Sequence, residues 1–358
     1  MFGRTREIRA IERWSYDVER RRHPDPLCFI GAPGMGKTCL LKHARESLRA
    51  KHWICGYSEA SPNAASAIDD FLEDMRRQLP RGRATAKFLS RLTEINVSAA
   101  GIGAGFKLSS AGQRTYYSRL LEIFAAIGDA PGTGVALLID EAQTLPKDDL
   151  RLIIRVINNL ENSPVSLIIA GLPGIPTRLG GERDESTQDR VRIPPQLLPL
   201  TSEESFDALA LPIKEVGGSV EDAQLKRMVH FAEGHPLTLR LLGSQAWELA
   251  DDDSADRRPL FISARHVAEA IKQTRRQLEV TYYEPMWSRC DKAERKLLIA
   301  IAGATGRTWR RLLLPSVQES IQDAPDLIYS LKCNGIISSG DRIQFTIPGF
   351  GQFVRRHG

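Results

Sequence analysis

Short, continuous apolar runs alternate with amphipathic segments through the first two hundred residues of the chain. An apolar run without polar alternation is typical of a strand that is buried on both faces. Such runs predict strands at residues 27–30, 53–57, 134–141 and 165–171. Strands that alternate with helices indicate an α/β fold with a parallel sheet covered on both faces. Apolar residues at helical spacing predict those helices at 8–22, 39–48, 64–78, 116–127 and 148–160.

Between residues 79 and 115 the pattern is weaker. Residues 87–92 predict a short helix, and the Gly- and Ala-rich stretch 95–108, with partly alternating apolar residues, predicts a β-hairpin. From residue 201 onward the pattern becomes helical. Thr201, with Glu204 three residues later, predicts a capping box at the start of the first of these helices. The expected helices are 202–216, 220–232, 236–250 and 263–278, with the acidic run 251–256 as a solvated loop.

The last segment has a different order of elements. Turn residues between two short apolar runs predict a strand, turn and strand over residues 335–347. Helices are expected before this hairpin at 291–303, 315–320 and 324–333, and after it at 350–356. Three helices followed by a hairpin is the order found in a winged helix. The expected domains are therefore an α/β core at 1–200, a helical domain at 201–285 and a winged-helix domain at 286–358.

A phosphate-loop motif, G-x-x-x-x-G-K-[ST], directly follows the first predicted strand and precedes a predicted helix. Glycines let the backbone turn tightly, and successive N–H groups at a helix start bind phosphate oxygens. Lys37 brings positive charge to the β- and γ-phosphates, and Thr38 offers a hydroxyl to Mg²⁺. The alternative is a Gly-rich turn with an incidental lysine. The predicted site for ATP and Mg²⁺ comprises Gly31, Ala32, Pro33, Gly34, Met35, Gly36, Lys37, Thr38 and Cys39.

Two carboxylates end the buried strand at residues 134–141. An aspartate in this place, about a hundred residues after a phosphate loop, can hold Mg²⁺, so Asp140 is the predicted metal ligand. The adjacent Glu141 can polarise and orient the attacking water, which makes it the predicted catalytic residue together with Lys37. The alternative for Glu141 is a carboxylate that stabilises a helix start.

The chain of 358 residues has 42% hydrophobic and 26% charged residues, which is ordinary for a globular protein, and no apolar run of membrane-spanning length. The charged start lacks a signal-peptide core, and five scattered cysteines lack a C-x-x-C pair, so a cytoplasmic protein is expected. Cys28 and Cys39 are expected to pack as small apolar residues. The net charge is +5, and residues 288–358 hold 11 basic and 6 acidic residues against 38 of each elsewhere. This basic segment is compatible with a nucleic-acid surface.

Together these motifs resemble P-loop NTPases of the AAA+ class and the related STAND class, nearest to archaeal-type and origin-initiator-like ATPases with a winged-helix tail. Gly3, Arg4 and Glu7 resemble the GRxxE entry segment of these families, which implies that Gly3 and Arg4 pack over the adenine. Residues 234–236 resemble the G-x-P motif of the STAND lid, which implies that Pro236 meets the nucleotide base. The helical domain would then be the lid of a P-loop ATPase core.

The chain departs from these families at the sensor positions. The strand at 165–171 lacks the polar residue that many AAA+ members carry at its end, and Gln143 or Ser166 could substitute for it. Leu237 stands where initiator ATPases have a sensor arginine, with Arg240 one helical turn later. The resemblance also implies an arginine finger that acts on a neighbouring subunit. The candidates are Arg178, Arg183, Arg190 and Arg192, of which Arg190 is preferred, with a surface arginine as the alternative.

Two functions remain open from the sequence. The first is an ATP-hydrolysing AAA+ switch that assembles as a homo-oligomer on double-stranded DNA, in replication, transposition or a mobile-element role. The second is a STAND-type signalling or defence NTPase whose winged helix contacts a protein partner. Helix 324–332 is poor in base-reading side chains, so sequence-specific reading of DNA is not expected. Basic residues available to DNA phosphates are Arg307, Arg310, Arg311, Lys332, Arg342, Arg355 and Arg356.

Overall fold

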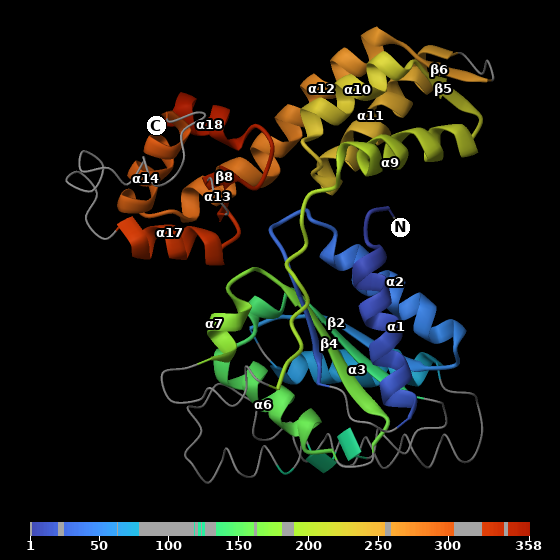
Figure 1. Ribbon diagram of the computed structural model, residues 1–358, viewed down its shortest axis with the longest axis vertical. Coiled ribbons are helices and arrows are strands. Elements are labelled where there is room, and N and C mark those ends of the chain that lie inside the picture. Colours follow the sequence, from blue (N-terminus) through green and yellow to red (C-terminus); the bar gives the residue numbers. More distant parts are fainter. Residues whose placement is uncertain are drawn as a thin grey trace. The chain divides into compact units, whose positions relative to one another are not determined.

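The chain forms two compact units (Figure 1). Residues 4–31 and 37–196 make up one, here called the sheet unit, and residues 1–3, 32–36 and 197–358 make up the other, the helical unit. The structure is a computed structural model. It describes residues 2–20, 25–62, 64–78, 118, 121–122, 124–125, 134–160, 163–180, 190–254, 259–303, 324–339 and 343–358.

The sheet unit contains a parallel four-stranded sheet in the order β1-β4-β3-β2, so the predicted α/β fold is confirmed. Its buried apolar strands pair in register, with Leu27 beside Ile168 and Ile168 beside Leu138. All four predicted strands are present, although the third ends at Asp140 and leaves Glu141 outside the sheet. The strands are β1 (Leu27–Ile30), β2 (Ile54–Glu59), β3 (Val135–Asp140) and β4 (Val165–Gly171).

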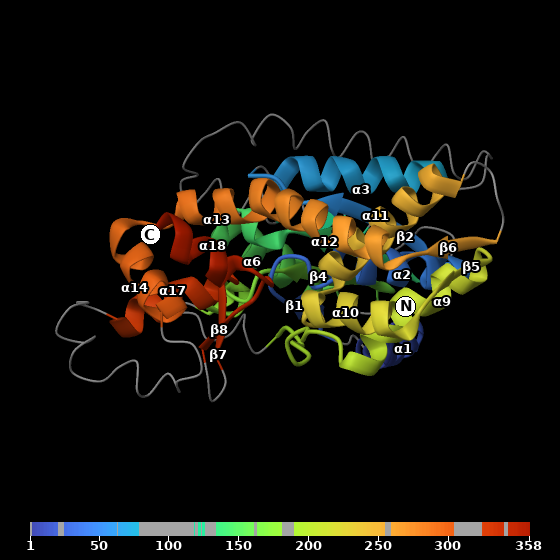
Figure 2. The same ribbon diagram turned by 90° about the horizontal axis from the view of Figure 1, so that it is seen from above.

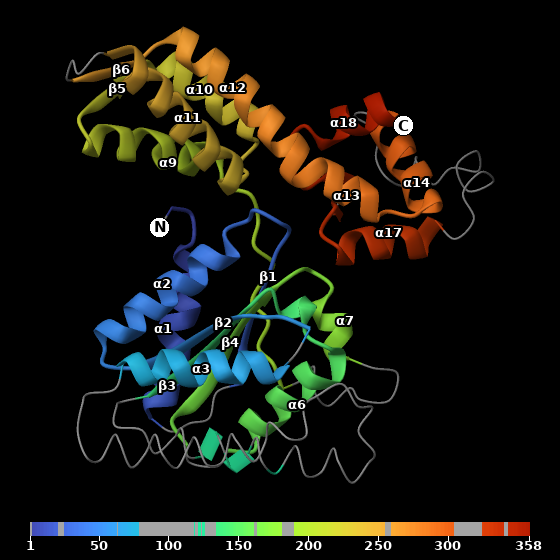
Figure 3. The same ribbon diagram turned by 180° about the vertical axis from the view of Figure 1, so that it is seen from behind.

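Helices cover both faces of this sheet. Leu137 and Leu167 pack in one cluster with the apolar sides of α3 and α6, and Figure 3 shows α3 in front of the strands. Alternate strand residues such as Leu138 point to the opposite face, and α2 also packs on these strands, with α1 against it. The helices are α1 (Thr5–Glu19), α2 (Lys37–Ala50), α3 (Ala64–Gln78), α6 (Lys147–Asn158) and α7 (Ile175–Leu179), with the 3₁₀ turn η1 (Ala142–Thr144).

Some predictions for the sheet unit are corrected by the structure, and others concern residues that the structure does not describe. The helix after the phosphate loop begins at Lys37, two residues earlier than expected. Cys28 is buried as predicted, whereas Cys39 is exposed, so its predicted packing as an apolar residue is wrong. The predicted hairpin 95–108, the short helix 87–92 and most of helix 116–127 lie outside the described residues.

The first part of the helical unit is a helical bundle around one apolar cluster, and Figure 2 shows α10, α11 and α12 side by side. The capping box is present, because Thr201 Oγ1 accepts from the Glu204 N–H at 3.2 Å and Glu204 Oε2 accepts from the Thr201 N–H at 2.8 Å. The helices are α9 (Ser202–Glu215), α10 (Asp222–Ala232), α11 (Pro236–Ser254) and α12 (Ala264–Leu278).

The sequence pattern missed two features of this bundle. Two short strands pair in parallel, β5 (Gly218–Val220) between α9 and α10 and β6 (Leu260–Ile262) between α11 and α12. The expected acidic loop is also wrong in part, because α11 continues to Ser254 and places Asp253 Oδ2 3.0 Å from His266 Nε2 on α12. Such a partner on another helix can extend a helix through residues that the local pattern assigns to a loop.

The C-terminal part has its own apolar cluster, in which Tyr283, Phe350 and Phe353 pack together. The described elements follow the predicted order, and β7 and β8 pair antiparallel as a hairpin. The predicted helix 315–320 lies outside the described residues, and no helix in the described chain has the length and apolar character to cross a membrane. The elements are the π turn η2 (Glu279–Tyr283), α13 (Glu284–Arg289), α14 (Lys292–Gly303), α17 (Ala324–Cys333), β7 (Ile337–Ser339), β8 (Ile343–Phe345) and α18 (Phe350–His357).

Candidate functional site

The phosphate loop connects the end of β1 to the first turn of α2. Gly34 and Gly36 have φ values of 75° and 87°, a left-handed conformation that glycine adopts without strain. Because α2 begins at Lys37, the unpaired N–H groups of its first turn are available to an anion at the loop. Thr38 lies in this same turn, and Cys39 follows it. The local geometry is that of a phosphate-binding loop.

Lys37 is 5% exposed, and its ammonium donates a hydrogen bond to the Gly31 carbonyl at 2.9 Å. Burial lowers the pKa of Lys37, while the negative charges of Glu141 and Asp140 act in the opposite direction. The structure therefore brings the predicted lysine and both predicted carboxylates into one electrostatic group. A bound polyphosphate would add negative charge and favour the charged form of Lys37 further.

Asp140 ends β3 and is 1% exposed. Its two carboxylate oxygens accept hydrogen bonds, Oδ2 from the Tyr57 hydroxyl at 3.1 Å and Oδ1 from the Glu141 N–H at 2.9 Å. Tyr57 comes from β2, the neighbouring strand, and was missed by the sequence analysis. The only signal for it was its place at the end of a predicted strand. Burial and the Asp140 charge raise the pKa of Tyr57, so it remains a hydrogen-bond donor at neutral pH.

The donor set fits Mg²⁺. A carboxylate at Asp140 and a hydroxyl at Thr38 are hard oxygen ligands, which Mg²⁺ prefers together with substrate phosphates and water. Within the described residues, no group of three or more His, Cys, Asp or Glu side chains is placed to hold a metal ion. An ion held by Thr38 and Asp140 would supply positive charge beside the nucleotide phosphates.

Glu141 lies just beyond β3 with φ of 49°, a left-handed conformation that is uncommon for residues other than glycine. Its side chain caps no helix, because the η1 turn that it precedes shows no side-chain cap hydrogen bond. Instead, Gln143 Nε2 donates to Glu141 Oε2, and Gln143 Oε1 accepts from the Leu172 N–H at 3.0 Å. Gln143 thus links the predicted catalytic carboxylate to the end of β4.

This link decides between the two substitutes for the missing sensor residue. Gln143 contacts Glu141 directly and lies at the carboxyl end of β4. Ser166 lies at the opposite end of that strand, where it pairs with Ala136 near the start of β3. Its hydroxyl is therefore remote from Glu141, and of the two candidates Gln143 is the one that contacts this carboxylate.

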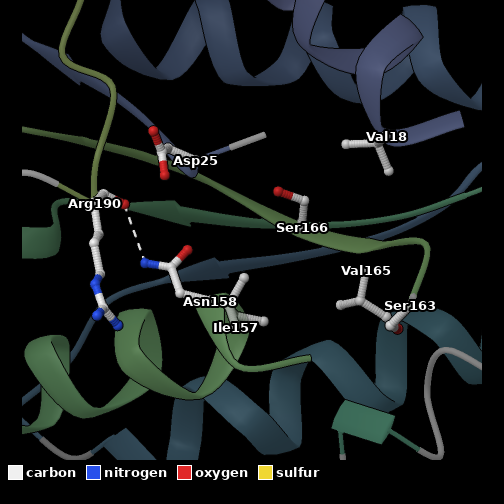
Figure 4. A pocket seen from close by; sticks show the side chains of 8 residues that line it. All are labelled: Val18, Asp25, Ile157, Asn158, Ser163, Val165, Ser166 and Arg190. Carbon is white, nitrogen blue, oxygen red and sulfur yellow. Dashed lines mark hydrogen bonds between the residues drawn. The ribbon is translucent and has the colours of Figure 1, made fainter. Parts of the chain in front are cut away.

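Arg190 lies at the amino-terminal edge of the sheet. Its carbonyl accepts a hydrogen bond from Asn158 Nδ2 at 3.1 Å, and it lines a cavity of about 190 Å³ with Asp25, Ser166 and others (Figure 4). The strands are parallel and the phosphate loop follows the carboxyl end of β1, so Arg190 lies at the opposite edge from Lys37 of its own chain. The predicted finger residue therefore does not face the phosphate loop of its own chain.

The other finger candidates are placed differently. Arg178 donates from Nη2 to the Leu145 carbonyl within its own unit. The backbone of Arg192 pairs beside β1, where it accepts from the Cys28 N–H at 3.0 Å and donates to the Pro26 carbonyl at 2.9 Å. Arg183 lies outside the described residues.

The remaining predicted residues belong to the helical unit, except Arg4, which belongs to the sheet unit. Pro236 opens α11, a favoured place for proline, and follows Gly234, which has φ of 75°. Gly3 has φ of 60°, and a side chain there would collide with Leu200 and Glu204. Arg4, the next residue, is buried at the start of α1. Arg240 is exposed on α11, which fits a surface role.

Comparison with known proteins agrees with this geometry. Residues 20–179 match the family model described as an AAA domain. A Walker-type ATPase of Pyrococcus abyssi is 18% identical, with 99% of this chain and 96% of that one covered at a TM-score of 0.61. The ORC2 protein of Aeropyrum pernix, in its ADP form, is 12% identical, with 93% and 87% covered at a TM-score of 0.54. These two similarities show the fold.

No curated protein matches the sequence. The AAA-domain match includes both the phosphate loop and the two carboxylates at the end of β3, which are predicted to bind and hydrolyse the nucleotide. ATP and Mg²⁺ are therefore its cofactors, and ATP hydrolysis is its reaction. The chain therefore resembles P-loop ATPases of the AAA+ class, with an AAA domain matched over residues 20–179 and a fold similar to that of the two solved structures.

Proposed function

We propose that this ATPase is a molecular switch that assembles as a homo-oligomer on double-stranded DNA when ATP is bound. The observation that carries the proposal is the charge of the C-terminal segment, whose 11 basic residues exceed its 6 acidic residues while the rest of the chain is balanced. A basic surface attracts the phosphate backbone of DNA without reading its sequence. The segment 286–358 would act as a winged-helix domain after the core and the lid.

The described contacts narrow the face that would meet DNA. Arg355 Nη1 donates to the Ala302 carbonyl at 2.7 Å, and Arg356 pairs with Glu279 at 3.3 Å, so both of these predicted contacts are engaged within the chain. By contrast, Lys292 and Lys296 are exposed and lie about one helical turn apart at the start of α14, and the exposed Arg289 ends α13 shortly before them. We infer that this row, here called the α14 row, contacts DNA phosphates.

The place of Arg190 supports assembly. Because it lies at the edge of the sheet opposite its own phosphate loop, a role for it in hydrolysis requires a neighbouring subunit. In the proposed cycle, the phosphate loop with Lys37 binds the nucleotide, and Thr38 and Asp140 hold Mg²⁺. Glu141 then orients the attacking water while Arg190 of a neighbour stabilises the charge of the transition state. Gly3, Arg4 and Pro236 would contact the base.

Fluorescence anisotropy on labelled double-stranded DNA tests the proposal. We expect binding that is stronger with a non-hydrolysable ATP analogue than with ADP and that falls steeply with salt. The double variant Lys292→Glu/Lys296→Glu should weaken binding by about tenfold or more and reduce the salt slope by about one per lost phosphate contact. The matched control is Lys226→Glu/Arg227→Glu, which makes the same charge change on exposed residues of α10.

Absence of DNA binding at low salt, with either nucleotide, would overturn the DNA proposal. The remaining function would then be a switch whose C-terminal domain contacts a protein. Equal weakening by the α14 pair and the α10 pair would contradict the assigned face, because the effect would then follow net charge alone.

A further inference from the structure

A buried histidine contacts the phosphate loop from the start of α11. His235 is 1% exposed, and its Nε2 lies 3.0 Å from the Pro33 carbonyl. The next loop carbonyl, that of Gly34, accepts from the Leu237 N–H at 3.2 Å. All of these residues belong to the helical unit. Two successive carbonyls of the loop are thus held by two donors from one helix start.

The partners of the ring determine its tautomer. A carbonyl oxygen only accepts hydrogen bonds, so the Nε2 atom that faces Pro33 must carry the proton. The Nδ1 lone pair is then left to accept from the Thr238 hydroxyl at 2.8 Å, and the Thr238 N–H lies 3.4 Å away on the same side. A neutral ring with its proton on Nε2 satisfies every one of these contacts.

Because of peptide geometry, this contact determines the direction of N–H groups in the phosphate loop. In a trans peptide the C=O and N–H bonds point in opposite directions. When His235 holds the Pro33 carbonyl, the N–H of Gly34 is turned away from α11. The Gly34 carbonyl, held by Leu237, likewise turns the Met35 N–H away, and that group lies 3.4 Å from the Ala32 carbonyl. The orientation of the Gly34 N–H, a donor in the loop that binds phosphate, therefore depends on the histidine.

Gly34 is adapted to this close approach. A Cβ atom at this position would lie 2.5 Å from Cε1 and 2.6 Å from Nε2 of His235. Any other residue would therefore displace the ring, in addition to the strain imposed by a φ of 75°. The glycine thus serves the contact with His235 as well as the turn of the loop.

We propose that His235 is a positioning residue that presets the phosphate loop for the nucleotide. It acts through the Pro33 carbonyl and not through the nucleotide itself. Holding the loop peptides in their binding orientation before the ligand arrives removes part of the ordering cost of binding. Loss of the contact should therefore weaken nucleotide affinity and leave the chemical step almost unchanged. The proposal rests on ATP binding alone and is independent of DNA.

Two substitutions separate the contact with Pro33 from the rest of the ring. In His235→Gln the side-chain amide nitrogen can reach the place of Nε2, whereas in His235→Asn it can reach only the place of Nδ1. We expect His235→Gln to bind Mg²⁺-ADP and a non-hydrolysable ATP analogue within about twofold of the unmodified chain. His235→Asn should bind them about three- to tenfold more weakly, the effect of one lost hydrogen bond. Isothermal titration calorimetry measures both affinities.

Steady-state kinetics distinguish positioning from general damage. In His235→Asn the KM for ATP should rise by the same factor as the dissociation constant, while kcat stays within about twofold. The control is His266→Asn, which removes a histidine from the first turn of α12, where it contacts Ser263 and Asp253. That variant should leave the affinity and KM unchanged, although it also alters a histidine in the helical unit.

Nitrogen-15 NMR on histidine-labelled chain tests the proposal without relying on a variant that must fold. The His235 signals, identified by their loss in His235→Gln, should report the tautomer with the proton on Nε2. The opposite tautomer would overturn the proposal. So would equal affinities of His235→Asn and the unmodified chain, or equally weakened binding by His235→Asn and His235→Gln.

Discussion

Gln143 donates a hydrogen bond to the Glu141 carboxylate and accepts one from the Leu172 N–H at 3.0 Å. Glu141 itself has a left-handed backbone and lies outside β3, so the sheet does not hold its side chain. The amide of Gln143 therefore fixes the direction of this carboxylate relative to β4. Gln143 thus brings a polar side chain to the end of β4, which has no polar residue of its own there.

We expect Gln143→Ala to lower kcat for ATP hydrolysis by about tenfold with little change in KM. The reason is that a general base must hold the water in a fixed geometry, and a displacement of about 1 Å can lower the rate a hundredfold. Measurement of kcat and KM for ATP checks the prediction. Gln245→Ala is the control, because it removes a glutamine that contacts Gln277 and Thr274 on α12. An unchanged kcat in Gln143→Ala would show that Glu141 needs no such support.

Glu141→Gln should keep nucleotide affinity and lose turnover by about 10²–10⁴-fold, the usual contribution of a general base. The amide keeps the size of the side chain but cannot accept the proton of the water. Lys37→Ala should instead lose nucleotide binding, because it removes the buried ammonium that faces the phosphates. Calorimetry and single-turnover hydrolysis separate the two effects. Hydrolysis at the ordinary rate in Glu141→Gln would remove Glu141 from its proposed role.

The alkaline stability of the chain depends on Tyr57. Its pKa is raised in the folded state by burial and by Asp140, so in the unfolded chain the phenol ionises first. The stability that this shift contributes is complete below about pH 10, the ordinary value for tyrosine, and is lost as the pH rises further. We therefore expect the free energy of unfolding, measured with urea, to fall more in the unmodified chain than in Tyr57→Phe as the pH rises from about 9 to 11. Parallel stability curves for the two would contradict the assigned shift.

The strands, the phosphate loop and the two carboxylates can be predicted from the sequence because each is encoded by neighbouring residues. Apolar runs identify β1 to β4, and the loop motif fixes Lys37 and Thr38 without any distant contact. The contact of Tyr57 was not predicted because its partner, Asp140, lies 83 residues later, on the neighbouring strand. His235 was recognised only as part of a motif, since the carbonyl that it contacts lies 202 residues earlier.

The other features that were not predicted have only weak patterns in the local sequence. The strands β5 and β6 have only three residues each, too few for an alternating pattern to emerge. The acidic run after residue 250 reads as a loop from composition, yet α11 extends into it as far as Ser254. Contacts across the bundle therefore determine whether these segments form strand, helix or loop, and the local sequence does not encode such contacts.

Arg190 gives the sharpest test of assembly. Arg190→Ala should lower ATP turnover by about 10³-fold or more without weakening nucleotide binding, because the guanidinium would act only on the transition state in a neighbour. Mixing it with Lys37→Ala should restore activity. In a mixed assembly, Lys37→Ala subunits supply an intact Arg190 to Arg190→Ala subunits, whose own phosphate loop is unaltered. Each variant alone remains inactive.

The mixing ratio provides the control. Activity should pass through a maximum near equal amounts of the two variants and should vanish on dilution, as the assembly dissociates. Arg178→Ala, whose guanidinium contacts the Leu145 carbonyl inside its own unit, should show no recovery in the same mixture, since any defect there arises within one subunit. If Arg190→Ala shows no recovery either, Arg190 does not act across a subunit boundary. If it hydrolyses ATP at the ordinary rate, the arginine has no part in catalysis.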